Sequence, residues 1–167
     1  MSKKDPIVGI IMGSKSDWKD VMEHCSEMLK EFGVKHDVRV ISAHRTPKRL
    51  ERFISEAEKN NYDVIIAAAG GAAHLAGVTA ALTTIPVLGV PMPSVTDGID
   101  SLLSTVQMPA GVPVATFAAG TAGATNAGIF AAQMLGVSDA SMAEKMVEFK
   151  KELREKTIQK DKNLARD

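Results

Sequence analysis

The stretch PIVGIIMG, residues 6–13, predicts the fold class because a short apolar run ends there in glycine. Its apolar residues are consecutive rather than alternating, which is typical of a parallel strand covered on both faces. The next segment has the spacing of an amphipathic helix, with Asp17 as a candidate N-cap and Gly33 just past the end. A buried strand followed by such a helix is the repeating unit of α/β proteins.

The same unit recurs along the chain. A second strand at residues 38–41 leads to Thr46, a candidate cap for a helix with Pro47 at its first position. Gly70 and Gly71 precede an alanine-rich helix. Further strands are expected at residues 63–69, 86–90 and 112–118. This alternation predicts a three-layer α/β sandwich around a doubly wound parallel sheet of the flavodoxin-like type, with functional loops at the carboxyl ends of the strands.

Two later segments predict helices of different kinds. Residues 118–132 contain seven alanines and three glycines among fifteen residues, so this helix allows close backbone approach and is expected at a crowded interface. From Ser138 a final helix carries a stripe of apolar residues, namely Met142, Met146, Phe149 and Leu153. We expect one domain over residues 1–167, with a core at about 6–137 and a terminal helix at about 138–160 that extends from the body.

Charged residues are distributed unevenly along the chain. Positions 1–63 hold 23 of them, positions 139–167 hold 15, and the 75 residues between hold only Asp97 and Asp100. Glycines and prolines interrupt this middle segment at intervals too short for a membrane-spanning helix. A domain of this size leaves roughly a third of its unfolded surface exposed, so a monomer would struggle to bury the whole segment. We therefore expect a homo-oligomer with a large apolar interface.

The composition argues against several classes of partner and site. The 20 basic and 20 acidic residues give zero net charge, so nothing favours nucleic acid or an anionic membrane as a partner. Cys25 is the single cysteine of the sequence, which excludes an internal disulfide and a cysteine-based zinc site. The first six residues lack the apolar stretch of a signal peptide, and we expect a cytoplasmic protein.

The loop after the first predicted strand reads GSKSD, residues 13–17. Its spacing matches neither a Walker A loop nor a dinucleotide-binding motif. Hydroxyl and backbone N–H groups at a helix N-terminus suit a phosphate, and a neighbouring carboxylate suits ribose hydroxyls. The alternative is that Ser14, Ser16 and Asp17 only cap the helix. The loop alone leaves both interpretations open.

Two further loops follow the second and third strands. In SAHRTP, residues 42–47, Arg45 is suited to bind phosphate and His44 to transfer protons near neutral pH, although a lone His-Arg pair is more often a surface feature. In AGGAAH, residues 69–74, paired glycines offer backbone N–H groups to a carboxylate, or simply permit a tight turn. The uncharged surroundings of His74 favour a buried, hydrogen-bonded histidine over a catalyst.

Five segments together resemble the PurE family of purine biosynthesis in order and spacing. They are GSKSDW at 13–18, SAHRTP at 42–47, AGGAAHL at 69–75, DSLLS at 100–104 and QMPAGVPVAT at 107–116. The resemblance covers about residues 8–135, and the second and third segments have the form of the mutase class, class I. This resemblance implies an isomerase that converts N5-carboxyaminoimidazole ribonucleotide to 4-carboxy-5-aminoimidazole ribonucleotide. The alternative is the carboxylase class, which makes the same product from aminoimidazole ribonucleotide and carbon dioxide.

The resemblance also implies roles for matching residues. It assigns proton transfer to His44 and the ribose hydroxyls to Asp17. The residues assigned to the phosphate are Ser14, Ser42 and Arg45, and those assigned to the pocket for the base and carboxylate are Ser16, Gly70, Gly71 and Ala72. It implies no metal or organic cofactor. The implied partners are a ribonucleotide substrate, seven further copies in a homo-octamer with sites at subunit contacts, and a functional link to the ATP-dependent synthetase that makes the substrate.

Two departures and one rival accompany this resemblance. Ala76 stands where most family members have proline, and the segment at 91–99 is about one residue shorter than usual. The rival is a flavodoxin-like binding module, which shares the sheet and would use the loop at Ser14 for a flavin phosphate. A flavin ring usually stacks on aromatic side chains, and these loops offer only Trp18.

Overall fold

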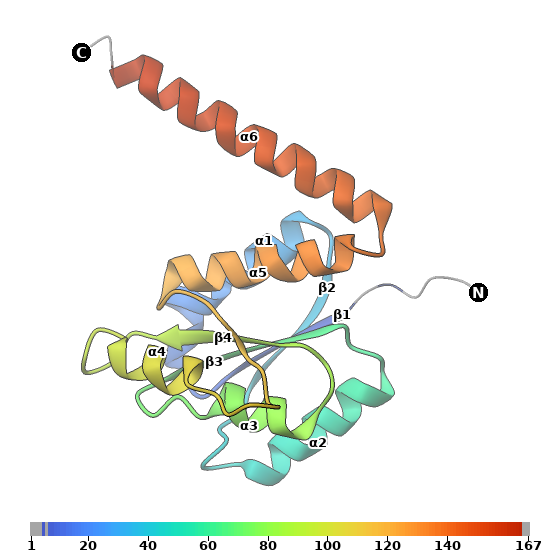
Figure 1. The fold of residues 1–167 in the computed structure, drawn as a ribbon, viewed down its shortest axis with the longest axis vertical. Helices are drawn as coiled ribbons and strands as arrows, with labels where there is room; N and C mark the ends of the chain where they lie inside the picture. The colour runs from blue at the N-terminus through green and yellow to red at the C-terminus, as the bar shows by residue number, and fades with distance from the viewer. Residues whose placement is uncertain (1–4, 6, 165–167) are drawn as a thin grey trace. The chain divides into compact units, whose positions relative to one another are not determined.

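The computed structural model describes residue 5 and residues 7–164, so Pro6, where the first predicted strand begins, lies outside the described residues. Within the described chain, five strands form one parallel sheet in the order β2-β1-β3-β4-β5 (Figure 1). The strands are β1 (Ile7–Met12), β2 (Lys35–Val40), β3 (Val64–Gly70), β4 (Val87–Met92) and β5 (Ala115–Thr116). This is the flavodoxin-like strand order, and the predicted fold class is confirmed.

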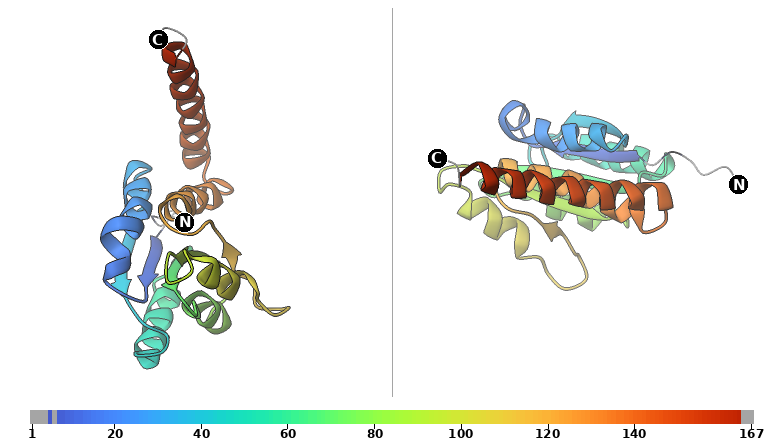
Figure 2. Two further views of the ribbon diagram at one scale, coloured as in Figure 1. Left: turned by 90° about the vertical axis from the view of Figure 1, so that its left-hand side faces the viewer. Right: turned by 90° about the horizontal axis from the view of Figure 1, so that it is seen from above.

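Helices connect these strands and cover both faces of the sheet. A π-helical turn, η1 (Trp18–Met22), continues directly into α1 (Glu23–Glu31). The other helices are α2 (Pro47–Lys59), α3 (Leu75–Leu82), α4 (Ile99–Val106), α5 (Thr121–Gly136) and α6 (Ala140–Leu164). Figures 1 and 2 show α1 on one face of the sheet and α2 and α3 on the other. The sheet is therefore the middle of three layers.

The central strands are buried because helices cover both of their faces. Every residue of β1 and of β4 is buried, whereas β2 is an edge strand and is largely exposed. Under α2, the side chains of Leu50, Phe53 and Ile54 belong to an apolar cluster that includes residues of the sheet. Burial of a side chain of this size stabilises the fold by roughly 1.5–3 kcal/mol. This rigid layer fixes where the loops at the strand ends begin.

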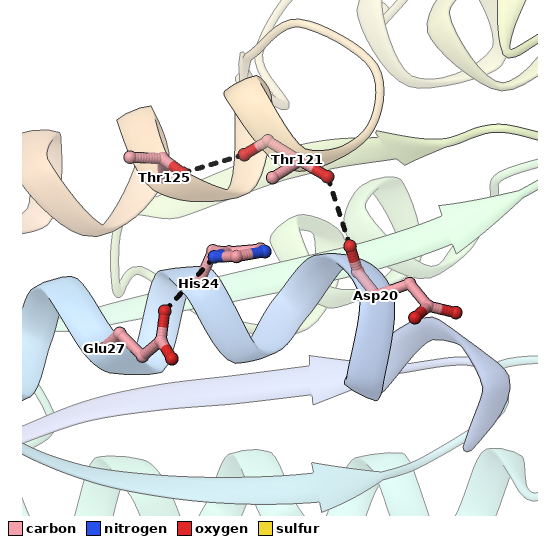
Figure 3. Close-up of polar contacts among 5 residues, drawn as sticks. All are labelled: Asp20, His24, Glu27, Thr121 and Thr125. Atoms are coloured by element: carbon pink, nitrogen blue, oxygen red, sulfur yellow. Dashed lines mark hydrogen bonds and ion pairs between the residues drawn. The ribbon is translucent and has the colours of Figure 1, made fainter.

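Small residues bring the first part of α5 against α1. A Cβ atom added at Gly128 would lie 2.8 Å from the carbonyl oxygen of Cys25, so only glycine permits this approach. Thr121 adds a hydrogen bond, in which its Oγ1 donates to the carbonyl oxygen of Asp20 at 3.1 Å (Figure 3). Cys25 is fully buried, and this burial raises the pKa of its thiol to about 12. The crowded contact expected for the alanine-rich helix is thus a contact with α1.

The chain divides into two compact units, one up to Ala131 and one from Ala132 onward. The second unit contains the end of α5 and all of α6, which is a single helix of 25 residues. Within this unit, a Cβ atom at Gly136 would lie 3.3 Å from the backbone nitrogen of Ala143, so glycine allows the chain to turn closely into α6. No helix among the described residues is both long and apolar enough to cross a membrane.

Several elements differ from the predicted ones. The sequence pattern predicts no helix at residues 99–106, yet α4 forms there, and the fifth strand shortens to Ala115–Thr116. Asp17 and Thr46 occupy N-cap positions but make no capping hydrogen bond. The reason is that both side chains bond within their own loops. The carboxylate of Asp17 accepts from the backbone of Ser14, and the hydroxyl of Thr46 bonds to the backbone of Ser42.

Candidate active site

Four loops meet at the carboxyl edge of the sheet because all five described strands run in the same direction. They follow β1, β2, β3 and β4, and together they line a cavity of about 640 Å³. The chain leaves β1 toward one edge of the sheet to form β2, and it later returns to β3 on the other side of β1. Ligands of doubly wound proteins bind at this switch in strand order.

Most of the site residues predicted from the sequence line this cavity. The predicted residues that line it are Ser14, Asp17, Ser42, His44, Arg45, Gly70 and Ala72. Ser16 and Gly71 are not among its lining residues. Gly71 instead takes a positive φ of 61°, which turns the chain out of β3, and Ser16 hydrogen-bonds to other residues of its own loop.

Ser42 and Arg45 form the part of the site best suited to an anion. The hydroxyl oxygen of Ser42 accepts hydrogen bonds from the backbone nitrogen and from Nε of Arg45, at 3.2 and 3.3 Å. The Arg45 Nη2 atom donates to the carbonyl oxygen of Gly13 at 2.8 Å, which ties this loop to the one after β1. A serine hydroxyl accepts two hydrogen bonds and donates one. With both acceptor positions used, the Ser42 hydroxyl has its hydrogen left for a ligand.

Ser14 shows the same arrangement on the facing loop. Its hydroxyl oxygen accepts from the hydroxyl of Ser16 at 2.8 Å and from the backbone nitrogen of Ser16 at 3.3 Å. Its own hydrogen is available to a ligand when the Ser16 hydroxyl donates to Ser14, and not when that hydroxyl donates to Oδ1 of Asp17, which lies 3.4 Å away. Two hydroxyl groups and one guanidinium group at one cavity suit a phosphate, because ionised phosphate oxygens accept hydrogen bonds and do not donate them. Ser16 contacts Ser14 and does not itself line the cavity.

Asp17 is the only carboxylate among the residues that line the cavity. Desolvation by burial raises the pKa of Asp17, and the backbone N–H of Ser14, the hydroxyl of Ser16 and the charge of Arg45 partly offset that rise. The backbone N–H of Ser14 donates to Oδ2 of Asp17 at 3.1 Å. The carboxylate is thus held in one orientation beside the phosphate donors. Carboxylate oxygens in this position suit the hydroxyl groups of a sugar.

His44 and His74 form a direct pair. The Nε2 atom of His44 lies 2.7 Å from Nδ1 of His74, and the two rings are nearly perpendicular, with centroids 4.9 Å apart. One of these nitrogens donates and the other accepts, so a single proton lies between them. Among the described residues, nothing bonds to Nδ1 of His44, which is therefore able to exchange a proton with a bound molecule. The expectation that His74 is buried is wrong, because it is exposed and lines the cavity.

The loop after β4 completes the cavity, although none of its residues was among the predicted site residues. Met92, Pro93, Ser94 and Val95 all line the opening. Ser94 donates to Oδ2 of Asp100 at 3.3 Å, which fastens this loop to the start of α4. The missed signal was positional, since the end of a fourth parallel strand must reach the same edge of the sheet as the first three. No group of three metal-binding side chains is found within the described part of the chain.

The fold and the site together define a class of protein. A flavodoxin-like sheet with hydroxyl and guanidinium groups and a histidine pair at its switch point is suited to an enzyme that acts on a small anionic molecule. The family model for AIR carboxylase matches residues 7–156. The chain belongs to this family, also called PurE, and the predicted membership is confirmed.

Individual relatives agree with this assignment. The N5-carboxyaminoimidazole ribonucleotide mutase of Vibrio parahaemolyticus is 53% identical over 161 residues, which cover 96% of this chain and 99% of that protein. The enzyme of the same name from Bacillus subtilis is 49% identical over 161 residues, with the same coverage. Among solved structures, the crystal structure of Treponema denticola PurE has a TM-score of 0.84 at 27% identity and covers 95% of this chain and 98% of that one.

Proposed function

We infer that this chain is an N5-carboxyaminoimidazole ribonucleotide mutase, an isomerase of de novo purine biosynthesis. Relatives of that name share about half of their residues with it over nearly the whole length of both chains. The structural observation that carries the inference is that His44 lines the same cavity as Ser14, Ser42 and Arg45. A proton-transfer group and a phosphate cradle are what an acid–base enzyme acting on a ribonucleotide requires.

The geometry supports one orientation of the substrate. Its phosphate accepts the free hydroxyl hydrogens of Ser14 and Ser42 and pairs with the guanidinium group of Arg45. Its ribose hydroxyls donate to the carboxylate of Asp17, which lies next to Ser14 in the same loop. The imidazole ring then points toward the loop after β3, where Gly70 and Ala72 line the cavity. Backbone groups of this loop hold the carboxyl group.

The chemistry moves one carboxyl group and one proton. The bond between the exocyclic nitrogen and the carboxyl carbon breaks, its electron pair stays on the nitrogen, and His44 protonates that nitrogen. The released carbon dioxide remains in the cavity, and the ring carbon attacks it to form the new carbon–carbon bond. His44 then removes the proton from that ring carbon, which returns the histidine to its starting state. Because the carbon dioxide is confined next to the ring carbon, the reaction needs no strong nucleophile from the protein.

His74 is proposed as a positioning residue for His44. The 2.7 Å hydrogen bond holds the ring of His44 in one orientation. A histidine that both gives and takes a proton must keep one orientation through the cycle. His74 provides this constraint from the loop after β3, across the switch in strand order.

The carboxylase reaction remains the alternative activity. It would use the same phosphate cradle and the same histidine, but it would draw carbon dioxide from solution. The mutase is favoured because relatives under that name match nearly the whole chain at about 50% identity. The two reactions differ in the origin of the carboxyl carbon, which an isotope can follow.

A homo-octamer with sites at subunit contacts is part of the proposal. Support comes from α4, which exposes three apolar side chains on its outer face, those of Ile99, Leu103 and Val106. Light scattering tests the assembly. We expect a mass of about eight times 17.8 kDa, and a stable mass of 17.8 kDa would contradict it.

We also propose a cytoplasmic location and a functional link to the ATP-dependent synthetase, because the product of that enzyme is the labile substrate of this one.

A direct assay tests the proposed activity. Purified protein is given N5-carboxyaminoimidazole ribonucleotide at low bicarbonate, and formation of 4-carboxy-5-aminoimidazole ribonucleotide is followed. We expect catalysed formation of this product, whereas spontaneous loss of carbon dioxide yields aminoimidazole ribonucleotide instead. Aminoimidazole ribonucleotide under the same low bicarbonate serves as the control substrate and should give no product. A protein that leaves the spontaneous decay unchanged would refute the proposal.

A further inference from the structure

A second cavity, of about 350 Å³, lies between β2 and α2 and is lined largely by arginine. Arg39 comes from β2, and Arg49 and Arg52 come from the first two turns of α2. The other lining residues are Ile41, Phe53 and Glu56. None of these six residues lines the active-site cavity. The two cavities are therefore separate, although Ile41 directly precedes the loop that carries His44.

The positive charges at this cavity are poorly neutralised. Within the described residues, Arg49 and Arg52 take part in no ion pair, and Arg39 pairs with Asp37 through Nε and Oδ2 at 3.0 Å. The first turn of α2 contains no acidic residue. Like charges three residues apart, and basic residues at a helix N-terminus, both destabilise a helix. These positive charges therefore destabilise the start of α2 unless an anion neutralises them.

Arginines on a protein surface usually have no binding role and simply contact solvent. Such residues normally project separately from convex surfaces, and a neutral chain has equal numbers of acidic residues with which to pair them. Here, three arginines from two elements line one hollow, and Glu56 is the single acidic residue among the residues that line it. A guanidinium group is planar and can donate two parallel hydrogen bonds to two oxygens of the same phosphate.

We propose that this cavity binds the phosphate group of a small phosphorylated molecule, at a site distinct from the active site. Three guanidinium groups, the carboxylate of Glu56 and the carboxylate of Asp37, which pairs with Arg39, give a net charge of +1. The cavity therefore keeps an excess of positive charge, carried by Arg49 and Arg52, that suits an anion. The volume of the cavity exceeds what a phosphate ion fills, which leaves room for the group that the phosphate esterifies.

The location gives the site a consequence for catalysis. β2 ends at Val40 and α2 begins at Pro47, so the cavity is bordered by the two elements on either side of the loop that carries His44. A phosphate bound by Arg39 on one side and by Arg49 and Arg52 on the other would join these elements. This step rests on the proposed function of His44, whereas the binding itself does not.

Titration calorimetry with inorganic phosphate tests the binding. In wild-type protein we expect two sites per chain, one at Arg45 and one at the arginine-lined cavity. The Arg45→Gln variant should keep the second site and lose the first. The double variant Arg49→Gln/Arg52→Gln should keep the first site and bind phosphate at the second at least about tenfold more weakly, because it loses two charged hydrogen-bond donors. Ribose 5-phosphate in the Arg45→Gln background distinguishes an ester, which should bind more tightly, from free phosphate.

A matched variant controls for charge alone. Lys30→Gln/Lys150→Gln also removes two positive charges, from exposed positions on α1 and α6. This control should leave both sites intact, and circular dichroism should show that every variant is folded. Unchanged phosphate binding in Arg49→Gln/Arg52→Gln would overturn the proposal, as would an equal loss in the lysine control. Because the readout is binding, failure here is independent of the mutase assay.

Discussion

The Nε2 atom of His44 lies 2.7 Å from the Nδ1 atom of His74, although the loops that carry them follow strands on opposite sides of β1. The switch in strand order is what brings them together. Neither loop alone shows the pair in the sequence, since 30 residues separate the two histidines. The contact turns an exposed loop histidine into one with a fixed orientation, and several predictions depend on it.

Replacing His44 by asparagine should abolish turnover while the ribonucleotide still binds. Asparagine keeps a polar side chain of similar size but has no group that titrates near neutral pH. General acid–base catalysis contributes about 10²–10⁴-fold, so kcat should fall at least by that factor. Steady-state kinetics and calorimetry with the product measure the two effects. The control is His24→Asn, which changes a partly exposed histidine of α1 paired with Glu27 (Figure 3). Near-normal activity in His44→Asn would remove His44 from the mechanism.

Replacing His74 by leucine should lower kcat with little change in KM. The substitution removes the hydrogen bond that orients His44 but leaves the phosphate cradle intact. A neutral hydrogen bond contributes about 0.5–1.5 kcal/mol, which corresponds to a loss of roughly 2–10-fold. His74→Asn should restore part of the rate, since an amide also bonds to Nε2 of His44. An equal loss in both variants, or a loss confined to KM, would contradict a positioning role.

Replacing Ser42 by alanine should weaken ribonucleotide binding. Its hydroxyl hydrogen is the donor that the protein leaves for the phosphate, and a hydrogen bond to a charged group contributes roughly 1.5–3 kcal/mol, or about 10–100-fold in Kd. The unphosphorylated nucleoside should bind weakly to both proteins, with no difference between them. Ser55→Ala, on the exposed face of α2, is the matched control. Equal affinity of the wild-type protein for nucleoside and nucleotide would refute the phosphate site.

Replacing Asp17 by asparagine should raise the melting temperature at pH 7 while weakening substrate binding. Burial raises the pKa of Asp17, so ionising this carboxyl costs more in the folded state than in the unfolded one. The contribution of this carboxyl group to the free energy of unfolding is therefore fully present below the pKa that the group has in the unfolded chain. That contribution is lost as the pH rises through the pKa of the group in the folded protein. The gain in the variant should vanish under acidic conditions. Asp20→Asn, at an exposed position in η1, is the control. A lower melting temperature for Asp17→Asn at pH 7 would contradict this account.

The sequence predicts the sheet, and site residues in three of the four loops, because the signals there are local. Consecutive apolar residues in β1 and β3, each followed by glycine, indicate buried parallel strands, and parallel strands must place their ends together. It does not predict α4, because that helix buries Ser101 and Thr105 and exposes Ile99 and Leu103. The hydroxyls of Ser101 and Thr105 bond to backbone carbonyls, so burial costs them little. An apolar face turned outward reverses the pattern from which helices are usually recognised.

The missed parts of the site have a similar explanation. Caps were predicted at Asp17 and Thr46 because these residue types cap helices, but the bonds within each loop depend on how neighbouring loops fold. His74 lies in an uncharged segment. Such a segment indicates burial in the core, but residues in a loop at the carboxyl ends of the strands can remain exposed. Its exposure follows from the turn at Gly71, whose positive φ is a property of the folded loop.

The origin of the carboxyl carbon tests the central claim most directly, because mutase and carboxylase give the same product. Substrate labelled in its carboxyl group is turned over rapidly in excess unlabelled bicarbonate, and the product is analysed by mass spectrometry. The account predicts that the label stays in the product, since carbon dioxide released in the cavity is captured before it escapes. Complete loss of the label, together with a rate on aminoimidazole ribonucleotide that rises with ordinary concentrations of bicarbonate, would contradict the account and assign the carboxylase reaction instead.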